Sequence, residues 1–401
     1  MKIKPVILCG GSGTRLFIKS KKNLPKQFMD FGGWTLFQKT LLRIKNPIFD
    51  SPIISTNLSY LNLVRKYLLK YKIKKYNIIL EPCKKNTAPA ILSSALLNEA
   101  YYNQPMIFLP ADHLIENHKK FNRSVNFNKK YLDSENIFIF GIKPHFPSSQ
   151  YGYFFTKKIT NEIHKVVKFI EKPNVDKAKR ILKKNAYWNS GILLARKDSI
   201  INNFKKFNPK ILNLCTQSVK KSKISKKTFY LNKKSFSKIQ EKSFDYAILE
   251  KSKNINGIKL NISWSDLGSW KEVLNFYSKN KKKYFKKRNV FYRPWGKYTN
   301  LFTGNNFLIK ELVVNPKSSI SLQKHNHRSE HWLVKSGKPK ITINKKIFFK
   351  DIDELAFIPC GSKHRIENPY NKPVKIMEAQ TGPILKETDI IRYQDIYGRV
   401  R

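Results

Sequence analysis

The segment VILCGGSGTRL, residues 6–16, decides the fold of the first part of the chain. A short apolar run followed directly by glycines is typical of a buried strand that ends in a tight turn, and such a turn lets backbone N–H groups approach a polyphosphate. Further apolar runs of strand length alternate with helical segments as far as about residue 276. This alternation predicts an α/β domain with a doubly wound, Rossmann-like sheet over residues 1–276. The clearest of these runs are PIIST (52–56), NIILEP (77–82) and MIFLPAD (106–112).

The pattern of apolar and polar residues changes near residue 290. Short alternating runs, such as FLIKELVV (307–314) and HWLVKSG (331–337), are separated by turn residues and contain no helical stretch. Such spacing is typical of an all-β barrel or sandwich. Between the two parts, KNKKKYFKKR (279–288) is a charge run without apolar periodicity. We therefore expect a basic linker over residues 277–289 and an all-β domain over residues 290–401.

The composition is strongly basic, with 79 Lys and Arg residues against 27 Asp and Glu residues and a formal net charge of +52. Most of these cations are lysines spread along the whole chain beside many Asn, Ile, Phe and Tyr residues, as AT-rich codons would produce. A nucleic-acid interface instead gathers its charge on one face or element. We expect no specific nucleic-acid partner, while binding of polyanions stays open as an alternative from another class of function.

The sequence favours the cytoplasm. No segment is apolar for long enough to span a bilayer, and the first apolar run stops at two glycines, so neither a membrane partner nor a signal peptide is expected. Four cysteines lie far apart without a CxxC spacing, which suits a reducing compartment. These cysteines are Cys9, Cys83, Cys215 and Cys360.

A series of motifs gives the first part of the chain a specific resemblance. In chain order they are GGSGTRL with PKQF (25–28), EPCKKNTAPA (81–90), PADH (110–113), YGYF (151–154), FIEKP (169–173), WNSG (188–191), SFDYAILEK (243–251) and WSDLGSW (264–270). With these motifs the chain resembles, over nearly its whole length, the bifunctional mannose-1-phosphate guanylyltransferase/mannose-6-phosphate isomerase family of type II. Family members usually carry a further β-helical segment before YRPWG (292–296), whereas here only about twenty residues separate it from WSDLGSW.

The resemblance implies formation of GDP-mannose and pyrophosphate from GTP and mannose-1-phosphate; physics alone selects neither the base nor the sugar. Arg15 and Lys26 are expected to stabilise the transition state at the α-phosphate, and Asp112 and Asp266 to hold Mg²⁺. The expected nucleotide-binding residues are Gly10, Gly11, Ser12, Gly13, Thr14, Glu81, Asn86 and Thr87. The expected sugar-binding residues are Tyr151, Gly152, Glu171, Lys172 and Asn189.

The second part of the chain resembles a cupin jelly-roll barrel. His325 and His327 share one face of a strand, and with Glu330 and His364 they would form a mixed N/O site for Zn²⁺ or a similar transition metal. Glu330 comes one residue earlier than the commoner cupin spacing. Lys363 and Arg365 are candidate phosphate or oxyanion partners.

The resemblance implies that this barrel interconverts mannose-6-phosphate and fructose-6-phosphate, although the sequence does not identify the general base. A transferase whose barrel is only structural or sugar-sensing stays open as the alternative. Homo-oligomerisation also stays open, because the middle segment is shortened.

Overall fold

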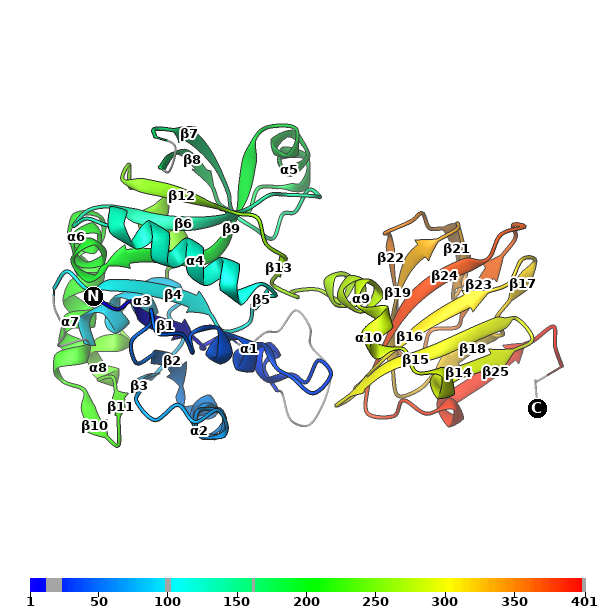
Figure 1. The fold of residues 1–401 in the computed structure, drawn as a ribbon. Coiled ribbons are helices and arrows are strands. Elements are labelled where there is room, and N and C mark those ends of the chain that lie inside the picture. The colour runs from blue at the N-terminus through cyan, green and yellow to red at the C-terminus, as the bar shows by residue number, and fades with distance from the viewer. Residues whose placement is uncertain (12–23, 98–101, 161–162, 399–401) are drawn as a thin grey trace. The chain divides into compact units, whose positions relative to one another are not determined.

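The computed structural model describes residues 1–11, 24–97, 102–160 and 163–398. The described chain divides into two compact units. One contains residues 1–11 and 36–266, and the other contains residues 24–35 and 267–398. Figure 1 shows the ribbon of each unit.

The N-terminal unit is built on an eleven-stranded sheet in the order β10-β11-β3-β2-β1-β4-β9-β6-β12-β8-β7. Its strands are β1 (Lys4–Leu8), β2 (Ile53–Asn57), β3 (Asn77–Glu81), β4 (Pro105–Pro110), β6 (Ile137–Ile142), β7 (Tyr153–Lys158), β8 (His164–Ile170), β9 (Ala186–Arg196), β10 (Lys223–Ser225), β11 (Thr228–Tyr230) and β12 (Ile255–Leu260). A separate two-stranded sheet pairs β5 (Leu114–Ile115) with β13 (Trp264–Ser265). The helices are α1 (Leu36–Arg43), α2 (Leu61–Lys70), α3 (Thr87–Leu97), α4 (His118–Asn128), α5 (Val175–Leu182), α6 (Lys197–Phe207), α7 (Pro209–Lys220) and α8 (Lys233–Phe236).

This arrangement confirms the predicted doubly wound α/β fold. Strands β11, β3, β2, β1 and β4 run parallel, so their carboxyl ends share one edge, where ligands of such sheets bind. The long strand β9 is antiparallel to both β4 and β6, which the strand–helix alternation does not reveal. Apolar α3 lies against α6 and α7 on one face, while Phe121 of α4 contacts Phe140 on the other.

The C-terminal unit is an all-β barrel of two sheets, as predicted. One sheet has the order β14-β15-β16-β24-β19-β22, and the other has the order β21-β20-β23-β18-β25 with β17 paired to β23. An apolar core that includes Trp332, Val374 and Ile366 draws its side chains from both sheets. The strands are β14 (Val290–Arg293), β15 (Gly296–Gly304), β16 (Phe307–Val314), β17 (Ser318–Ser319), β18 (Leu322–His325), β19 (Ser329–Ser336), β20 (Lys340–Ile343), β21 (Lys346–Phe349), β22 (Leu355–Ile358), β23 (His364–Asn368), β24 (Val374–Thr381) and β25 (Ile390–Gln394).

The segment before the barrel differs from the expected linker. Helix α9 (Trp270–Lys279) starts with a capping box between Ser269 and Glu272 and packs on β19 and β24. Helix α10 (Lys281–Tyr284) follows within the basic segment, and its Tyr284 is only 8% exposed. The unit boundary therefore falls at residues 266–267, ahead of the expected boundary at 276, because the amphipathic α9 buries its apolar side with the barrel.

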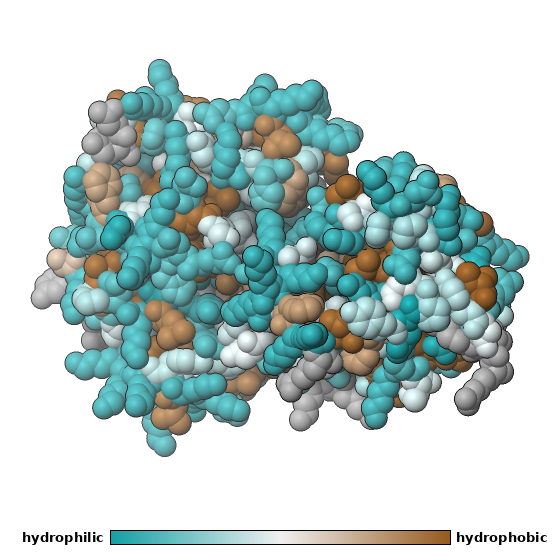
Figure 2. Space-filling view, turned by 45° about the vertical axis from the view of Figure 1, so that its right-hand side comes forward, coloured by the Kyte–Doolittle hydropathy of each residue, from teal (hydrophilic) through white to brown (hydrophobic). Residues whose placement is uncertain are grey.

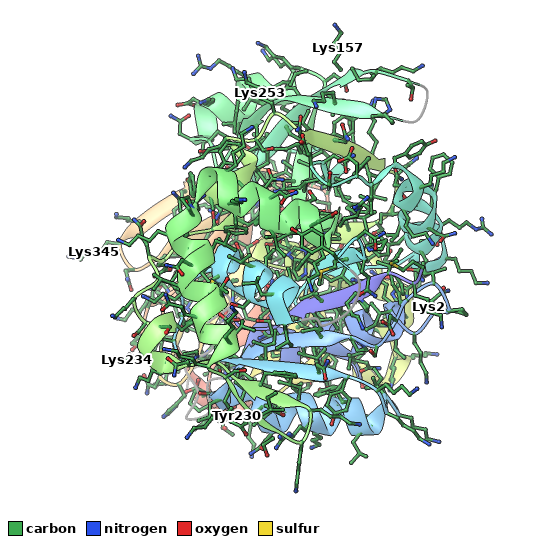
Figure 3. All side chains as sticks on the ribbon, turned by 90° about the vertical axis from the view of Figure 1, so that its left-hand side faces the viewer. Lys2, Lys157, Tyr230, Lys234, Lys253 and Lys345 are labelled. Carbon is green, nitrogen blue, oxygen red and sulfur yellow. The ribbon has the colours of Figure 1, made fainter. Side chains whose placement is uncertain are left out.

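The basic side chains are dispersed. Figure 2 shows hydrophilic residues over most of the displayed face, with small apolar areas between them. Lys2, Lys157, Lys234 and Lys253 extend outward from different elements of the N-terminal unit (Figure 3). Within the part of the chain that the structure describes, no helix is long and apolar enough to cross a membrane. Among the described residues none of the four cysteines forms a disulfide, and Cys360 is exposed.

Candidate active sites in the two units

The glycine turn after β1 lies near a partly buried carboxylate. Glu81 ends β3 and accepts a hydrogen bond from the Ser55 hydroxyl on β2 at 2.6 Å. A Cβ atom on Gly10 would lie 3.8 Å from Glu81 Oε1, while one on Gly11 would meet no atom of the described residues within 4 Å. Burial raises the pKa of Glu81 to about 7, although the Ser55 bond opposes this shift. The carboxyl edge of the sheet thus leaves the turn open to a ligand on one side.

Five more residues, Lys26 among them, were predicted to contact the nucleotide or its phosphates. Lys26 lies in the short 3₁₀ helix η2 (Lys26–Phe28) of the C-terminal unit and is buried. The predicted Ser12, Gly13, Thr14 and Arg15 lie outside the described residues.

Asn86 and Thr87 form the start of α3. Asn86 has a positive φ of 68°, and its side-chain oxygen accepts a bond from the Thr87 amide at 2.9 Å. The Thr87 hydroxyl accepts a bond from the amide of Phe244 at 2.8 Å. Asn86 is exposed, whereas Thr87 fastens the 243–251 segment to α3. Of the two, Asn86 is therefore the better placed for a ligand.

The two predicted magnesium carboxylates follow paired strands. Asp112 follows β4 and precedes β5, and Asp266 follows β13 directly. In the antiparallel β5–β13 pair, Ser265 is the partner of Leu114, so Asp266 leaves β13 at the end where the chain from Asp112 enters β5. The β5–β13 pair therefore places both aspartates near the same end of this small sheet, and oxygen donors of this kind fit Mg²⁺.

Tyr151 fixes the buried member of this pair. Its hydroxyl donates to Asp266 Oδ1 at 2.8 Å, and both side chains are buried. The Tyr151 ring contacts Trp188 and Trp264 edge to face, with centroid distances of 5.0 and 5.4 Å. Packing thus limits the ring to one orientation, and the Tyr151 hydroxyl is engaged by the carboxylate of Asp266.

The adjacent Gly152 is one of the residues predicted to bind the sugar. A Cβ atom on Gly152 would lie 2.6 Å from Glu171 Oε2 and 3.6 Å from Asn189 Cβ, so glycine is needed for this close approach. The Gly152 carbonyl accepts the Asn189 amide at 2.8 Å. Lys172 lies 3.4 Å from Glu171 Oε1, with its own side chain largely exposed. The structure therefore brings together four of the predicted sugar residues.

Asp245 joins this group, although sequence reasoning gave it no role. It begins the π-helical turn η5 (Asp245–Leu249), and its Oδ1 accepts from Asn189 Nδ2 at 2.9 Å. Burial and the neighbouring Asp245 charge raise the pKa of Glu171 to about 7, and burial also raises the pKa of Asp245. Its place in SFDYAILEK, one of the ordered family motifs, was the available signal. Two carboxyls, an amide and an ammonium group can together bind several hydroxyls and a phosphate.

The barrel contains a buried group that could hold a metal ion. His325, Glu330 and His364 present ligand atoms that lie within 4.8 Å of one another. Each histidine Nδ1 lies near a backbone carbonyl, at 3.2 Å for His325 and 2.8 Å for His364. Nδ1 must carry the proton in that arrangement, which leaves Nε2 of each ring as the donor to a metal.

The electrostatics of the group suit the same role. Burial lowers the pKa of His364 and so keeps its ring neutral. Burial alone would raise the pKa of Glu330, but its interactions with His325, His364 and Arg328 lower it well below the usual value. Two imidazole nitrogens and one carboxylate fit a borderline divalent metal.

His327 does not join this group. Its Nδ1 lies 2.8 Å from Asp389 Oδ1, and half of its side chain is exposed. Strand β18 ends at His325 and the chain bends at the next two residues, so the alternation that would put both histidines on one face stops there. Buried Arg328 lies nearer instead, with Nη2 at 3.4 Å from His325 Nε2 and Nε at 3.3 Å from Glu330 Oε1.

The predicted phosphate partners also lie elsewhere. Lys363 is exposed and stands over the Tyr393 ring at 3.9 Å, and Arg365 faces Glu367 at 3.6 Å. Neither lines the barrel cavity, which has an empty volume of about 530 Å³ including its open part. The cations that do line it are Arg293, Lys310, Arg328 and Arg392.

The cavity also holds a second carboxyl beside Glu330. Burial and the Glu330 charge raise the pKa of Glu378 to about 8. Trp332 Nε1 donates to both carboxyls, at 3.1 Å to Glu330 and 3.4 Å to Glu378. Gln380 Nε2 does the same, at 3.1 and 3.2 Å. Sequence reasoning missed Glu378, Arg293 and the other cavity cations, since they come from strands without a ligand motif.

Comparisons with known proteins identify both domains of the chain. Residues 4–283 match the nucleotidyl transferase family model, and residues 279–395 match the mannose-6-phosphate isomerase C-terminal model. The chain is 32% identical to the alginate biosynthesis protein AlgA of Pseudomonas fluorescens, over 98% of this chain and 96% of that protein. It is 30% identical to a mannose-1-phosphate guanylyltransferase of Klebsiella pneumoniae, over 98% and 99% of the two chains.

Solved structures extend this comparison. A mannose-6-phosphate isomerase of Helicobacter pylori matches with a TM-score of 0.58 and 28% identity, over 66% of this chain and 100% of that one. A Thermus thermophilus protein described as a mannose-1-phosphate geranyltransferase matches with a TM-score of 0.60 over 69% and 80%, and at 22% identity it supports the fold alone. The chain is an enzyme of the nucleotidyl transferase family, and it belongs to the two-domain branch that carries a mannose-6-phosphate isomerase C-terminal domain.

Proposed function

We propose that the chain forms GDP-mannose and pyrophosphate from GTP and mannose-1-phosphate with Mg²⁺. The observation that carries the proposal is the dipeptide Tyr151-Gly152. Tyr151 holds the carboxylate of Asp266, while Gly152 makes room for Glu171 and Asn189. Adjacent residues therefore connect Asp266, one of the two proposed metal ligands, to the group proposed to bind the sugar, as a reaction between a sugar phosphate and a metal-bound nucleotide requires.

The proposed reaction is a displacement at phosphorus. A phosphate oxygen of mannose-1-phosphate attacks the α-phosphorus of GTP, the new P–O bond forms, and the bond to the β-phosphate breaks to release pyrophosphate. Arg15 and Lys26 would neutralise charge on the α-phosphate, and Glu171 and Asn189 would hold the sugar hydroxyls. Bound at Asp112 and Asp266, Mg²⁺ would neutralise charge on the phosphates.

The direct test is pyrophosphate release by the full chain with Mg²⁺, crossing GTP, ATP, UTP and dTTP with mannose-1-phosphate and glucose-1-phosphate. Turnover confined to GTP with mannose-1-phosphate, and lost in Asp112→Ala, would support the proposal. Turnover with another pair would keep the reaction class and change the substrates. No turnover with any pair would contradict it.

We further propose that the barrel isomerises mannose-6-phosphate to fructose-6-phosphate. The favouring observation is the His325, Glu330 and His364 group beside a cation-lined cavity. The reaction moves one proton from C2 to C1 and one from O2 to O1, without a further reactant. A divalent metal would steady the enediolate oxygens. The phosphate partners would be Arg293, Lys310 and Arg392 in place of Lys363 and Arg365.

Metal analysis of the full chain, together with isomerase turnover before and after chelation, separates this proposal from its alternative. Bound metal with turnover that chelation abolishes would support the isomerase. Binding of mannose-6-phosphate without turnover would instead indicate a sensing barrel. Salt-sensitive, sequence-indifferent binding of nucleic acid would be polyelectrolyte behaviour of a +52 chain and no evidence of a specific partner. The cytoplasm is the proposed compartment, as both substrates are cytoplasmic metabolites.

A further inference from the structure

The segment that carries Lys26 is packed into the C-terminal unit. Residues 24–35 cluster with that unit, although they follow the glycine turn of the first strand. Helix η2 leads into a tight turn in which Asp30 Oδ1 accepts the amides of Gly32, Gly33 and Trp34 at 3.0, 2.7 and 3.1 Å. The Phe31 amide donates to the Trp34 carbonyl at 2.8 Å and closes the turn. The turn is therefore a rigid unit attached directly to η2.

Tyr284 of the basic segment binds both sides of this turn. Its hydroxyl donates to the Phe31 carbonyl at 3.3 Å and accepts from Trp34 Nε1 at 3.4 Å. Gly32 has a φ of +105°, and a Cβ there would lie 2.7 Å from Tyr284 Cε1, so the ring also fills the space against the turn. One side chain thus holds the turn by two hydrogen bonds and by direct contact.

An aromatic cluster connects Tyr284 to the barrel. Its ring centroid lies 4.9 Å from Tyr277 of α9 and 6.4 Å from Phe302 of β15. Trp34 meets Phe276 edge to face at 5.6 Å. The turn is therefore anchored to α9 and to a barrel strand.

We propose that Tyr284 is a positioning residue for nucleotidyl transfer, because it holds the turn that sets the place of η2 and its Lys26. This inference rests on the proposed transferase reaction and on Lys26 acting at the α-phosphate. A catalytic cation must be held within about 1 Å of its productive place, since displacement of that size costs on the order of 100-fold in rate. Tyr284 acts through the turn and touches no substrate.

The test uses the full chain with Tyr284→Phe, Tyr284→Ala and the control Tyr277→Phe. Tyr277 lies in the same cluster, and the described part of the chain offers its buried hydroxyl no hydrogen-bond partner. We expect kcat for pyrophosphate release to fall roughly 5- to 10-fold in Tyr284→Phe and about 100-fold in Tyr284→Ala. The KM values for both substrates should stay within about twofold, and Tyr277→Phe should behave as the unsubstituted chain does.

Hydrogen exchange of the 24–35 segment supplies a readout independent of catalysis. We expect faster exchange in both Tyr284 variants and not in Tyr277→Phe, with little change in the strands of the barrel. If the unsubstituted chain releases no pyrophosphate but exchange is still faster in the Tyr284 variants, Tyr284 holds the turn and the proposed transferase function is wrong. Unchanged exchange and unchanged kcat in a folded Tyr284→Ala would overturn the inference, as would equal losses of kcat in all three variants.

Discussion

Gly152→Ala tests the sugar-binding group most directly. The new Cβ would lie 2.6 Å from Glu171 Oε2 and 3.1 Å from Phe169 Cζ. Ordinary contact begins near 3.4 Å, so the carboxylate must move by about 0.8 Å. A displacement of that order costs about 100-fold in kcat/KM, which corresponds to about 2.7 kcal/mol. The strain should also cost about 1–3 kcal/mol of folding free energy.

The assay is pyrophosphate release at saturating GTP with mannose-1-phosphate varied. Gly141→Ala is the matched control, because its Cβ would lie 2.5 Å from Phe154 Cζ and 2.8 Å from Tyr187 Cβ, where there is no carboxylate. Both variants should melt at lower temperature, but only Gly152→Ala should raise the KM for mannose-1-phosphate, with the KM for GTP nearly unchanged. Equal KM values in the two variants would refute the placement of Glu171 at the sugar.

Three further predictions follow from the two sites. Because the pKa of Glu171 is raised to about 7, its ionisation lowers the folding stability as pH rises from about 4.5 to 7. Glu171→Gln should therefore melt at a higher temperature than the unsubstituted chain at pH 8 and should lose turnover of mannose-1-phosphate. A lower melting temperature of this variant at pH 8 would contradict the raised pKa. Tyr151→Phe removes the bond to Asp266 and should raise the Mg²⁺ concentration for half-maximal transferase activity about 10-fold or more, and an unchanged titration would rule out this support. His364→Ala should remove both bound metal and isomerase turnover, whereas His327→Ala should keep the metal; the reverse result would restore His327 as a ligand.

Local patterns predicted the architecture because strands, helices and glycine turns are each encoded over a few residues. The antiparallel direction of β9 could not be predicted, since a strand carries no local mark of its orientation, and β9 contributes Asn189 to the sugar group. The H-x-H spacing failed for His327 because the strand ends at His325. Tyr284 was hidden in a charge run, where one aromatic residue leaves no periodic signal. The direction of β9, the position of His327 and the contacts of Tyr284 each depend on residues that are distant in the sequence.

The packing of residues 24–35 with the C-terminal unit bears on how such a chain can be divided in evolution or in the laboratory. A fusion of two finished domains would leave a junction at which the gene could be split again. Here the C-terminal unit is formed by two separate segments of the chain, and residues 36–266 lie between them in the sequence. Any cut within that insert separates the Phe31 turn from Tyr284. A barrel exchanged between relatives would therefore have to be transferred together with its N-terminal turn. We expect the turn and the barrel to change together in evolution.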